Sequence, residues 1–209
     1  MNDSARKAVV VMGTMDTKGA ELTYLARRIE EAGCRAILFD VGAHYKSQFP
    51  ADISMDQVAA ASGMSAEELR RLPRGEAVDK ISQAAASYLN DMVASGRANA
   101  VIGLGGSGGT TICAAAMRPL PYGVPKLLVS TLASGNTRWH LDISDIVMMP
   151  SVLDIGGLNP MLEMVLTNAA NAIAGMAKGQ QAYVPSGKQV VSLTMYGTTT
   201  PGVSQARRR

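Results

Sequence analysis

The sequence predicts an α/β fold, a doubly wound parallel sheet in a Rossmann-like or flavodoxin-like three-layer sandwich. Short apolar runs of strand length alternate along the chain with longer segments of helical apolar spacing. This alternation is typical of parallel strands joined by crossover helices that cover both faces of the sheet. The 209 residues, 47% hydrophobic and 18% charged, suffice for one such domain with a substantial core.

The first part of the chain reads as a strand–helix unit followed by a second strand. Residues 8–12 are an apolar run of strand length, and a helix is expected from about Thr17 to Ala32, where Gly33 ends it. Residues 35–39 form the second strand. The polar stretch that follows holds two short helices, over 55–61 and 65–71, and is expected to be a surface excursion.

The remaining elements continue the alternation of strands and helices. Apolar residues at helical spacing predict a helix over 75–95. The next expected elements are a strand over 98–104, a helix over 111–117, and strands over 126–129 and 146–149. Asn159 then caps a helix that has Pro160 in its first turn and runs to about Lys178.

Three of the predicted strands end in chemically rich loops, over 13–19, 105–111 and 130–138. In the flavodoxin-like order 2-1-3-4-5 these strands are neighbours, and the topological switch point lies between the first and the third. Ligands of such sheets bind at the carboxyl ends of the strands. We therefore expect all three loops to line one crevice.

The loop after the third strand is rich in glycine. Glycines let backbone amides approach an anion closely, and a following helix start adds unpaired N–H groups and a partial positive charge. This pattern predicts a nucleotide or phosphate site. The predicted binding residues here are Gly105, Gly106, Ser107, Gly108, Gly109, Thr110 and Thr111.

Two known fingerprints fit the glycine stretch only in part. The spacing from Gly103 to Gly108 matches the dinucleotide pattern, but the next strand ends in Ser130 instead of an acid that would bind ribose. The same spacing begins a P-loop, and Gly109 and Thr110 stand where that loop has Lys and Ser or Thr, so the P-loop lysine is missing. A glycine-rich turn that only lets a strand and a helix pack closely is the structural alternative.

The loop after the first strand supplies Gly13, Thr14, Asp16, Thr17 and Lys18 as further binding candidates. Lys18 could provide the positive charge that the glycine loop lacks, or be a solvated surface lysine. Asp16 is expected to cap the helix in preference to binding a metal on a phosphate.

Asp40 ends the second strand, at the position where doubly wound folds carry a ribose-binding acid, and could equally be a turn residue. The loop after the fourth strand adds a dense set of donors suited to a phosphate or carboxylate, and Arg138 could bind such a group with its planar fork. The candidates in that loop are Ser134, Gly135, Asn136, Thr137 and Arg138.

Composition argues against several classes of function. The net charge of +3 comes from the three arginines at 207–209, and aromatic residues make up only 4%, so nucleic-acid binding is not expected. No apolar run approaches the roughly 20 residues of a membrane span, and residues 1–12 are too short for a signal peptide. We expect a cytoplasmic protein. Cys34 and Cys113 lack metal-ligand spacing, which predicts buried thiols and no metal site.

The C-terminal region and the last long helix bear on assembly. Residues 189–196 read as another strand and 197–202 as one more strand-end loop, so 1–185 is predicted to be one subdomain and 186–209 the start of a second. The helix over 160–178 has more apolar surface than one sheet-facing stripe requires. A homodimer is therefore expected, with Met and Leu side chains of this helix near its centre.

Four motifs together carry a family resemblance. They are Gly13-Thr-Met-Asp-Thr-Lys-Gly19, Gly103-Leu-Gly-Gly-Ser-Gly-Gly-Thr110, Lys126-Leu-Leu-Val-Ser-Thr-Leu-Ala-Ser-Gly135 and Asp154-Ile-Gly-Gly-Leu-Asn159. With them the chain resembles, over nearly its whole length, the ATP-binding family of the tomato mosaic virus resistance protein and its uncharacterised bacterial relatives. The resemblance implies ATP binding, dimerisation and a second Rossmann-like subdomain, and in the plant member inhibition of viral replication through the viral helicase.

The expected function is a module that binds ATP, with or without Mg²⁺, or a related phosphorylated ligand, and that is regulatory or part of a larger assembly. A separate partner subunit could supply the second subdomain. One alternative is an enzyme subunit that acts on a phosphorylated small molecule. Another is a protein-interaction domain in which the glycine loops are purely structural. No catalytic nucleophile or general base is evident in the sequence.

Overall fold

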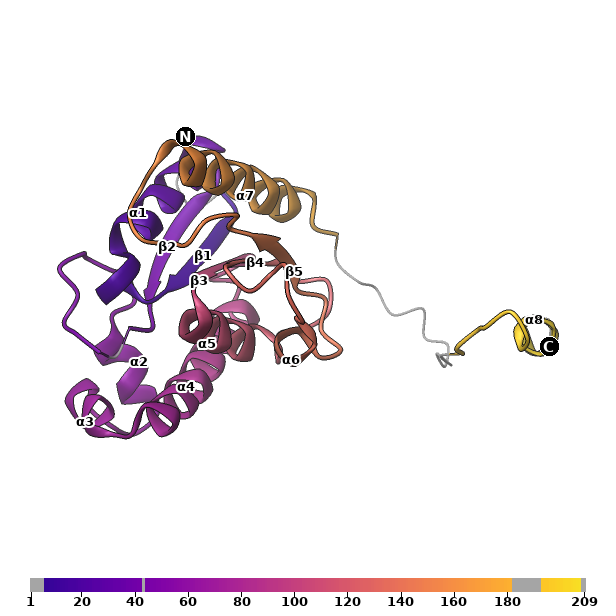
Figure 1. The fold of residues 1–209 in the computed structure, drawn as a ribbon, viewed down its shortest axis with the longest axis horizontal. Coiled ribbons are helices and arrows are strands. Elements are labelled where there is room, and N and C mark those ends of the chain that lie inside the picture. Colours follow the sequence, from indigo (N-terminus) through magenta and orange to yellow (C-terminus); the bar gives the residue numbers. More distant parts are fainter. Residues whose placement is uncertain (1–5, 43, 182–192, 208–209) are drawn as a thin grey trace.

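The fold is built on a sheet of five parallel strands in the order β2-β1-β3-β4-β5 (Figure 1). The structure is a computed structural model that describes residues 6–42, 44–181 and 193–207. The strands are β1 (Ala8–Gly13), β2 (Arg35–Asp40), β3 (Ala100–Gly105), β4 (Lys126–Ser130) and β5 (Val147–Pro150). The predicted α/β class and the predicted strand order are confirmed. All six residues of β1 are buried, as a central parallel strand covered on both faces requires.

Two layers of helices cover the sheet, because the residues of a strand point alternately to its two faces. Val9 and Val11 of β1 pack with α1 (Met15–Glu31) and α7 (Pro160–Gly179). Val10 and Met12 belong to the core on the other face. The helices of that face are α2 (Met55–Ala61), α3 (Ala66–Arg71), α4 (Arg74–Ala94) and α5 (Ser107–Met117). Cys34 and Cys113 are buried free thiols, as predicted.

The segment that holds α2 and α3 is part of the core, which corrects the expected surface excursion. Val58 of α2 and Leu69 of α3 are fully buried in the cluster that includes α4. Each of the two short helices begins with a complete capping box, from Ser54 with Gln57 and from Ser65 with Glu68. The caps fix the two helix starts, and the buried side chains hold them against α4.

Helix α7 begins as predicted, with Asn159 as its cap and Pro160 in the first turn. The Leu162 amide donates to Asn159 Oδ1 over 3.0 Å. Most of its apolar side chains pack on the chain's own sheet, the buried ones being Leu162, Val165, Leu166, Ala169, Ala170, Ile173, Ala174 and Ala177. The expected second face is reduced to Met161 and Met164, which are 45% and 54% exposed.

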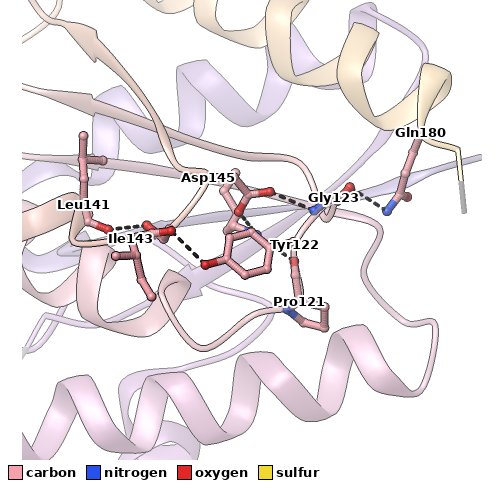
Figure 2. A network of polar contacts seen from close by, with 9 residues as sticks. Pro121, Tyr122, Gly123, Leu141, Ile143, Asp145 and Gln180 are labelled. Atoms are coloured by element: carbon pink, nitrogen blue, oxygen red, sulfur yellow. Dashed lines mark hydrogen bonds and ion pairs between the residues drawn. The ribbon is translucent and has the colours of Figure 1, made fainter. Parts of the chain in front are cut away.

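A polar network closes the amino-terminal edge of the sheet near the start of β4 (Figure 2). Lys126 is fully buried, and its ammonium pairs with Asp145 Oδ1 over 2.7 Å and donates to the Pro121 carbonyl over 2.8 Å. The Gly123 amide donates to Asp145 Oδ2 over 2.8 Å, and the Tyr122 hydroxyl donates to the Ile143 carbonyl over 2.9 Å. These bonds join the loop before β4 to the loop before β5.

The structure bears on only part of the C-terminal expectations, and the subdomain boundary after residue 185 stays a prediction. Residues 189–192 of the expected strand lie outside the described residues, and residues 193–196 carry no strand. Thr200–Arg207 form α8, so Thr200 and Pro201 begin a helix instead of lying in an extended loop. A four-residue helix, α6 (Arg138–Leu141), precedes β5. No helix of the described residues is long and apolar enough to cross a membrane.

Candidate functional site

A cavity of ≈ 240 Å³ lies at the carboxyl ends of β1 and β3, and we call it the α4–α5 pocket. Its lining combines polar residues from the starts of α1, α4 and α5 with apolar residues from α4, α5 and the chain directly after β2. Its lining residues are Thr14, Asp16, Thr17, Lys18, Val41, His44, Arg74, Ala77, Val78, Ile81, Gly106, Ser107, Gly108, Gly109 and Ile112. The structure therefore brings two of the three predicted loops together at the switch point of the sheet.

The glycine stretch forms the start of α5, which corrects the expected long loop. Helix α5 begins at Ser107, four residues earlier than predicted. Gly106 is the N-cap residue and, as a glycine, makes no side-chain capping bond. A Cβ on Gly105 would lie only 2.6 Å from the backbone of Gly109 and Thr110, so glycine is what allows the strand to turn directly into the helix. The first helical bond runs from the Thr110 amide to the Gly106 carbonyl.

The amides of Ser107, Gly108 and Gly109 precede that first helical bond and border the pocket. They form the free N–H groups and the partial positive charge of a helix N-terminus. Thr110 is buried, and its hydroxyl bonds to the Gly105 carbonyl and to Ser130 Oγ, so its role is structural. The Thr111 hydroxyl donates to the Ser107 carbonyl.

Arg74 is the functional candidate that sequence reasoning missed. It is the first residue of α4, and its Nη2 lies 3.6 Å from where a Cβ on Gly108 would stand. Its guanidinium makes no hydrogen bond or ion pair with any residue in the described part of the chain. Only the fold brings α4 beside the start of α5, although Pro73 before Arg74 could have marked the helix start.

Asp16 does not cap α1, contrary to expectation. Thr14 is the cap residue, and Asp16 Oδ2 accepts the amides of His44 and Tyr45, each over 3.0 Å. Asp16 Oδ1 is buried and has no hydrogen-bond partner among the described residues. This carboxylate holds the chain after β2 against α1, and the residue lines the pocket.

Asp40 is buried at the end of β2 and does not line the pocket. The carboxyl is buried, and its Oδ1 accepts the amides of Met15 and Gly42 over 3.0 and 2.8 Å. Burial raises the pKa of Asp40 to about 6, against the lowering effect of these two amides, and the nearby Asp16 raises it further. Asp40 thus helps to hold the start of α1, as a turn residue would.

Lys18 lines the pocket, but its ammonium is already engaged. Its Nζ donates to the Ile155 carbonyl, and its backbone departs from helical geometry. The hydroxyls of Thr14 and Thr17 bond to each other over 2.8 Å at the pocket edge. Gly13 lies below them, where a Cβ would come within 2.9 Å of the Leu104 carbonyl. The first loop therefore gives the pocket two hydroxyls, the Asp16 carboxylate and a lysine whose ammonium is already hydrogen-bonded.

The loop after β4 lies elsewhere, which corrects the expectation of one crevice. It turns back on itself through a bond from the Gly135 amide to the Leu132 carbonyl. Ser134 lines a different cavity, between the ends of β4 and β5. Asn136 Oδ1 accepts the amide of Arg138, and Thr137 precedes α6. None of these residues lines the α4–α5 pocket.

The pocket as a whole suits a ligand with an anionic end and an apolar end. Three helix-start amides and the Arg74 guanidinium lie on one side, where they could bind phosphate oxygens. Val41, Val78 and Ile81 supply apolar lining. Among the described residues no group of three or more His, Cys, Asp or Glu side chains could hold a metal ion on its own.

Comparison with known proteins gives one family match and several relatives. The model of the uncharacterised protein family (UPF0261) N-terminal domain matches residues 7–182. A UPF0261 protein of Rhizobium meliloti (strain 1021) is 46% identical over 201 residues, which cover 95% of this chain and 49% of the relative. A UPF0261 protein of Clostridium tetani is 39% identical over 96% of this chain and 50% of its own.

A plant relative is more distant. The ToMV resistance protein Tm-1(GCR237) of Solanum lycopersicum is 34% identical over 224 residues, which cover 96% of this chain and 29% of the tomato protein. The chain thus spans about half the length of the bacterial relatives and less of the tomato one.

Proposed function

The chain belongs to the uncharacterised protein family UPF0261, and from this premise we propose that its α4–α5 pocket binds a phosphorylated small molecule, with ATP as the first candidate. The observation that carries the proposal is the Arg74 guanidinium, which has no partner among the described residues, beside the amides of the first turn of α5. A phosphate there would accept charge-assisted hydrogen bonds from both. The apolar wall would take the uncharged end of the ligand, such as a base.

Mg²⁺ fits the same site as a companion of the phosphates. Asp16 lines the pocket, and its buried Oδ1 has no hydrogen-bond partner among the described residues. Mg²⁺ in such sites is held by one or two carboxylates together with phosphate oxygens. The ion would satisfy the orphaned oxygen and reduce its repulsion of the phosphates.

We infer a binding or regulatory role within a larger assembly. The chain spans about half the length of its bacterial relatives, so the remainder of such a protein could act on the ligand bound here. The pocket residues would bind and orient the ligand. No two of the lining residues form an evident nucleophile–base pair.

The direct test uses Gly108→Val. Gly108 lies in the first turn of α5, and a side chain there faces the space beside Arg74, so the variant should fold while its side chain occupies the position of the anion. We expect calorimetry to show an ATP affinity at least tenfold lower, which is about 1.4 kcal/mol. Gly175→Val is the matched control, because Gly175 lies in α7 with open space around it.

The outcomes separate the readings of the pocket. Lost ATP binding in Gly108→Val, with retained binding in Gly175→Val, would support the phosphate site. Unchanged affinity in a folded Gly108→Val protein would contradict it. A wild-type protein that binds neither ATP nor pyrophosphate would favour the reading in which the glycines are purely structural.

A second prediction ranks the two cations of the pocket. Arg74→Ala should weaken ATP binding by about 1–3 kcal/mol, as expected for a charge-assisted hydrogen bond, and should affect adenosine less. Lys18→Ala should also weaken ATP more than adenosine, but by less than Arg74→Ala, because the Lys18 ammonium already donates to the Ile155 carbonyl. Arg71→Ala is the control, since Arg71 does not line the pocket and its ion pair with Glu67 is exposed. Equal losses for ATP and adenosine would place Arg74 away from the phosphates.

A further inference from the structure

A second cavity, of ≈ 410 Å³, opens at the carboxyl ends of β4 and β5, and we call it the β4–β5 pocket. It is lined by the loop after β4, through Thr131 and Ser134, and by the loop after β5, through Ser151, Val152 and Asp154. The second of these loops includes the start of the motif Asp154-Ile-Gly-Gly-Leu-Asn159. The α4–α5 pocket does not account for that motif.

The side chains of the β4–β5 pocket are hydroxyls and one carboxylate. Neither the Thr131 hydroxyl nor the Ser134 hydroxyl has a hydrogen-bond partner among residues 6–42, 44–181 and 193–207. Asp154 is exposed, and its Oδ1 accepts the amide of Ile155 over 2.9 Å. The lining contains no Lys, Arg or His. The Lys18 ammonium, which donates to the Ile155 carbonyl, does not line this pocket. A carboxylate in a lining without a cation disfavours phosphate and can accept hydrogen bonds from neutral hydroxyl groups.

The loop after β5 is held in place from both sides. The Ser151 amide donates to the Ser130 carbonyl over 3.1 Å, and the Ser151 hydroxyl donates to the Leu153 carbonyl over 2.6 Å. Val152, between Ser151 and Leu153, has a φ of 68°, a conformation that a β-branched residue adopts only when its surroundings impose it. Further along, the Gly157 amide donates to Glu21 Oε1 over 2.7 Å. The pocket wall is therefore preformed.

The two pockets meet at Gly106. This glycine lines the α4–α5 pocket, and a Cβ on it would lie 4.0 Å from Thr131 Oγ1 of the β4–β5 pocket. A ligand group in one pocket can thus approach a ligand group in the other over the bare backbone of Gly106.

We propose that the β4–β5 pocket binds the vicinal diol of a sugar. The Asp154 carboxylate accepts hydrogen bonds from two adjacent hydroxyl groups, while the hydroxyls of Thr131 and Ser134 can both donate and accept. The exposed side chains of Val152 and Leu153 offer apolar surface to the carbon–hydrogen face of a sugar ring. The diol belongs either to the ribose of a nucleotide or to a separate sugar.

The test measures binding of methyl ribofuranoside by saturation-transfer NMR, without any phosphate present. The wild-type protein should bind it with a dissociation constant in the millimolar range, as a few hydrogen bonds allow, and should bind the corresponding deoxy sugar at least tenfold more weakly. Asp154→Asn and Ser134→Ala should each weaken binding severalfold. Asp91→Asn, a change at an exposed aspartate of α4 outside both pockets, should leave it unchanged.

Added ATP distinguishes the two sources of the diol. If ATP displaces the ribofuranoside, the pocket holds the ribose of the nucleotide, and if both bind together, it holds a separate sugar. Gly108→Val should leave ribofuranoside binding intact, so failure of the phosphate site would not remove this signal. Absence of ribofuranoside binding, equal binding of the deoxy sugar, or binding insensitive to Asp154→Asn would overturn the proposal.

Discussion

Asp145→Ala should lower the free energy of unfolding by about 3 kcal/mol, because it leaves the buried ammonium of Lys126 without its counter-ion. The figure is the lower end of the range for a broken buried pair, since the Asp145 side chain is 37% exposed and water can approach the space it vacates. The same substitution removes the acceptor of the Gly123 amide (Figure 2). Urea unfolding at neutral pH measures the loss.

A double-mutant cycle separates this explanation from a simple loss of contacts. Lys126→Met should be milder than Asp145→Ala, because the remaining carboxylate is partly in water. The double variant Lys126→Met/Asp145→Ala should be more stable than Asp145→Ala alone, since no unpaired buried charge remains. Additive losses would contradict the role given to the ion pair.

Acid should weaken the same pair. Burial raises the pKa of Asp145, but the hydrogen bonds from Lys126 and from the Gly123 amide outweigh burial, so the pKa lies below the ordinary value of 3.8. A carboxyl with a lowered pKa stabilises the fold above its unfolded pKa, and this stabilisation is lost as the pH falls through the folded value. The loss is therefore expected below pH 3.8.

Asp40 should give the opposite pH dependence in a higher range. Its folded pKa of about 6 exceeds the ordinary value of 3.8, chiefly because the carboxyl is buried. The folded protein then binds more protons than the unfolded chain between these values, so stability falls as the pH rises from about 4 to about 6. At one pKa unit per 1.36 kcal/mol, the full change is on the order of 3 kcal/mol.

Asp40→Asn isolates this effect. The amide oxygen of asparagine can still accept the amides of Met15 and Gly42, so the start of α1 should be retained. Chemical unfolding at a series of pH values should show a flatter profile for the variant between pH 4 and pH 7, and the variant should exceed the wild type in stability at neutral pH. An unchanged slope would show that Asp40 is not the titrating group.

The close backbone approach at the end of β3 was predictable from local sequence, but the helix start there was not. The glycines after β3 indicated a close backbone approach, and the contact that a Cβ on Gly105 would make shows why glycine is needed there. The start of α5 was predicted at Thr111 instead of Ser107 because glycine has a low helix propensity, which the tertiary packing of α5 overrides. The phosphate-binding expectation for these residues stays a prediction.

The residues that complete each pocket were not predictable in the same way. Arg74 lies more than thirty residues from the glycines in sequence and reaches them only because α4 packs beside α5. The loop after β4 faces β5 instead of the first loop, which separates Ser134 from the glycine amides. The partner of Lys126 is Asp145, in a loop that carries no local sign of an ion pair.

The sequence by itself determined the α/β class, the parallel order of the strands and the start of α7, because apolar periodicity and capping residues act over a few neighbouring positions. Only the tertiary structure decided which charges meet. It placed Arg74 beside the amides of α5, turned Asp16 toward the chain after β2, and buried Lys126 against Asp145. Such contacts join segments distant along the chain, so their geometry depends on how helices and loops pack on the completed sheet.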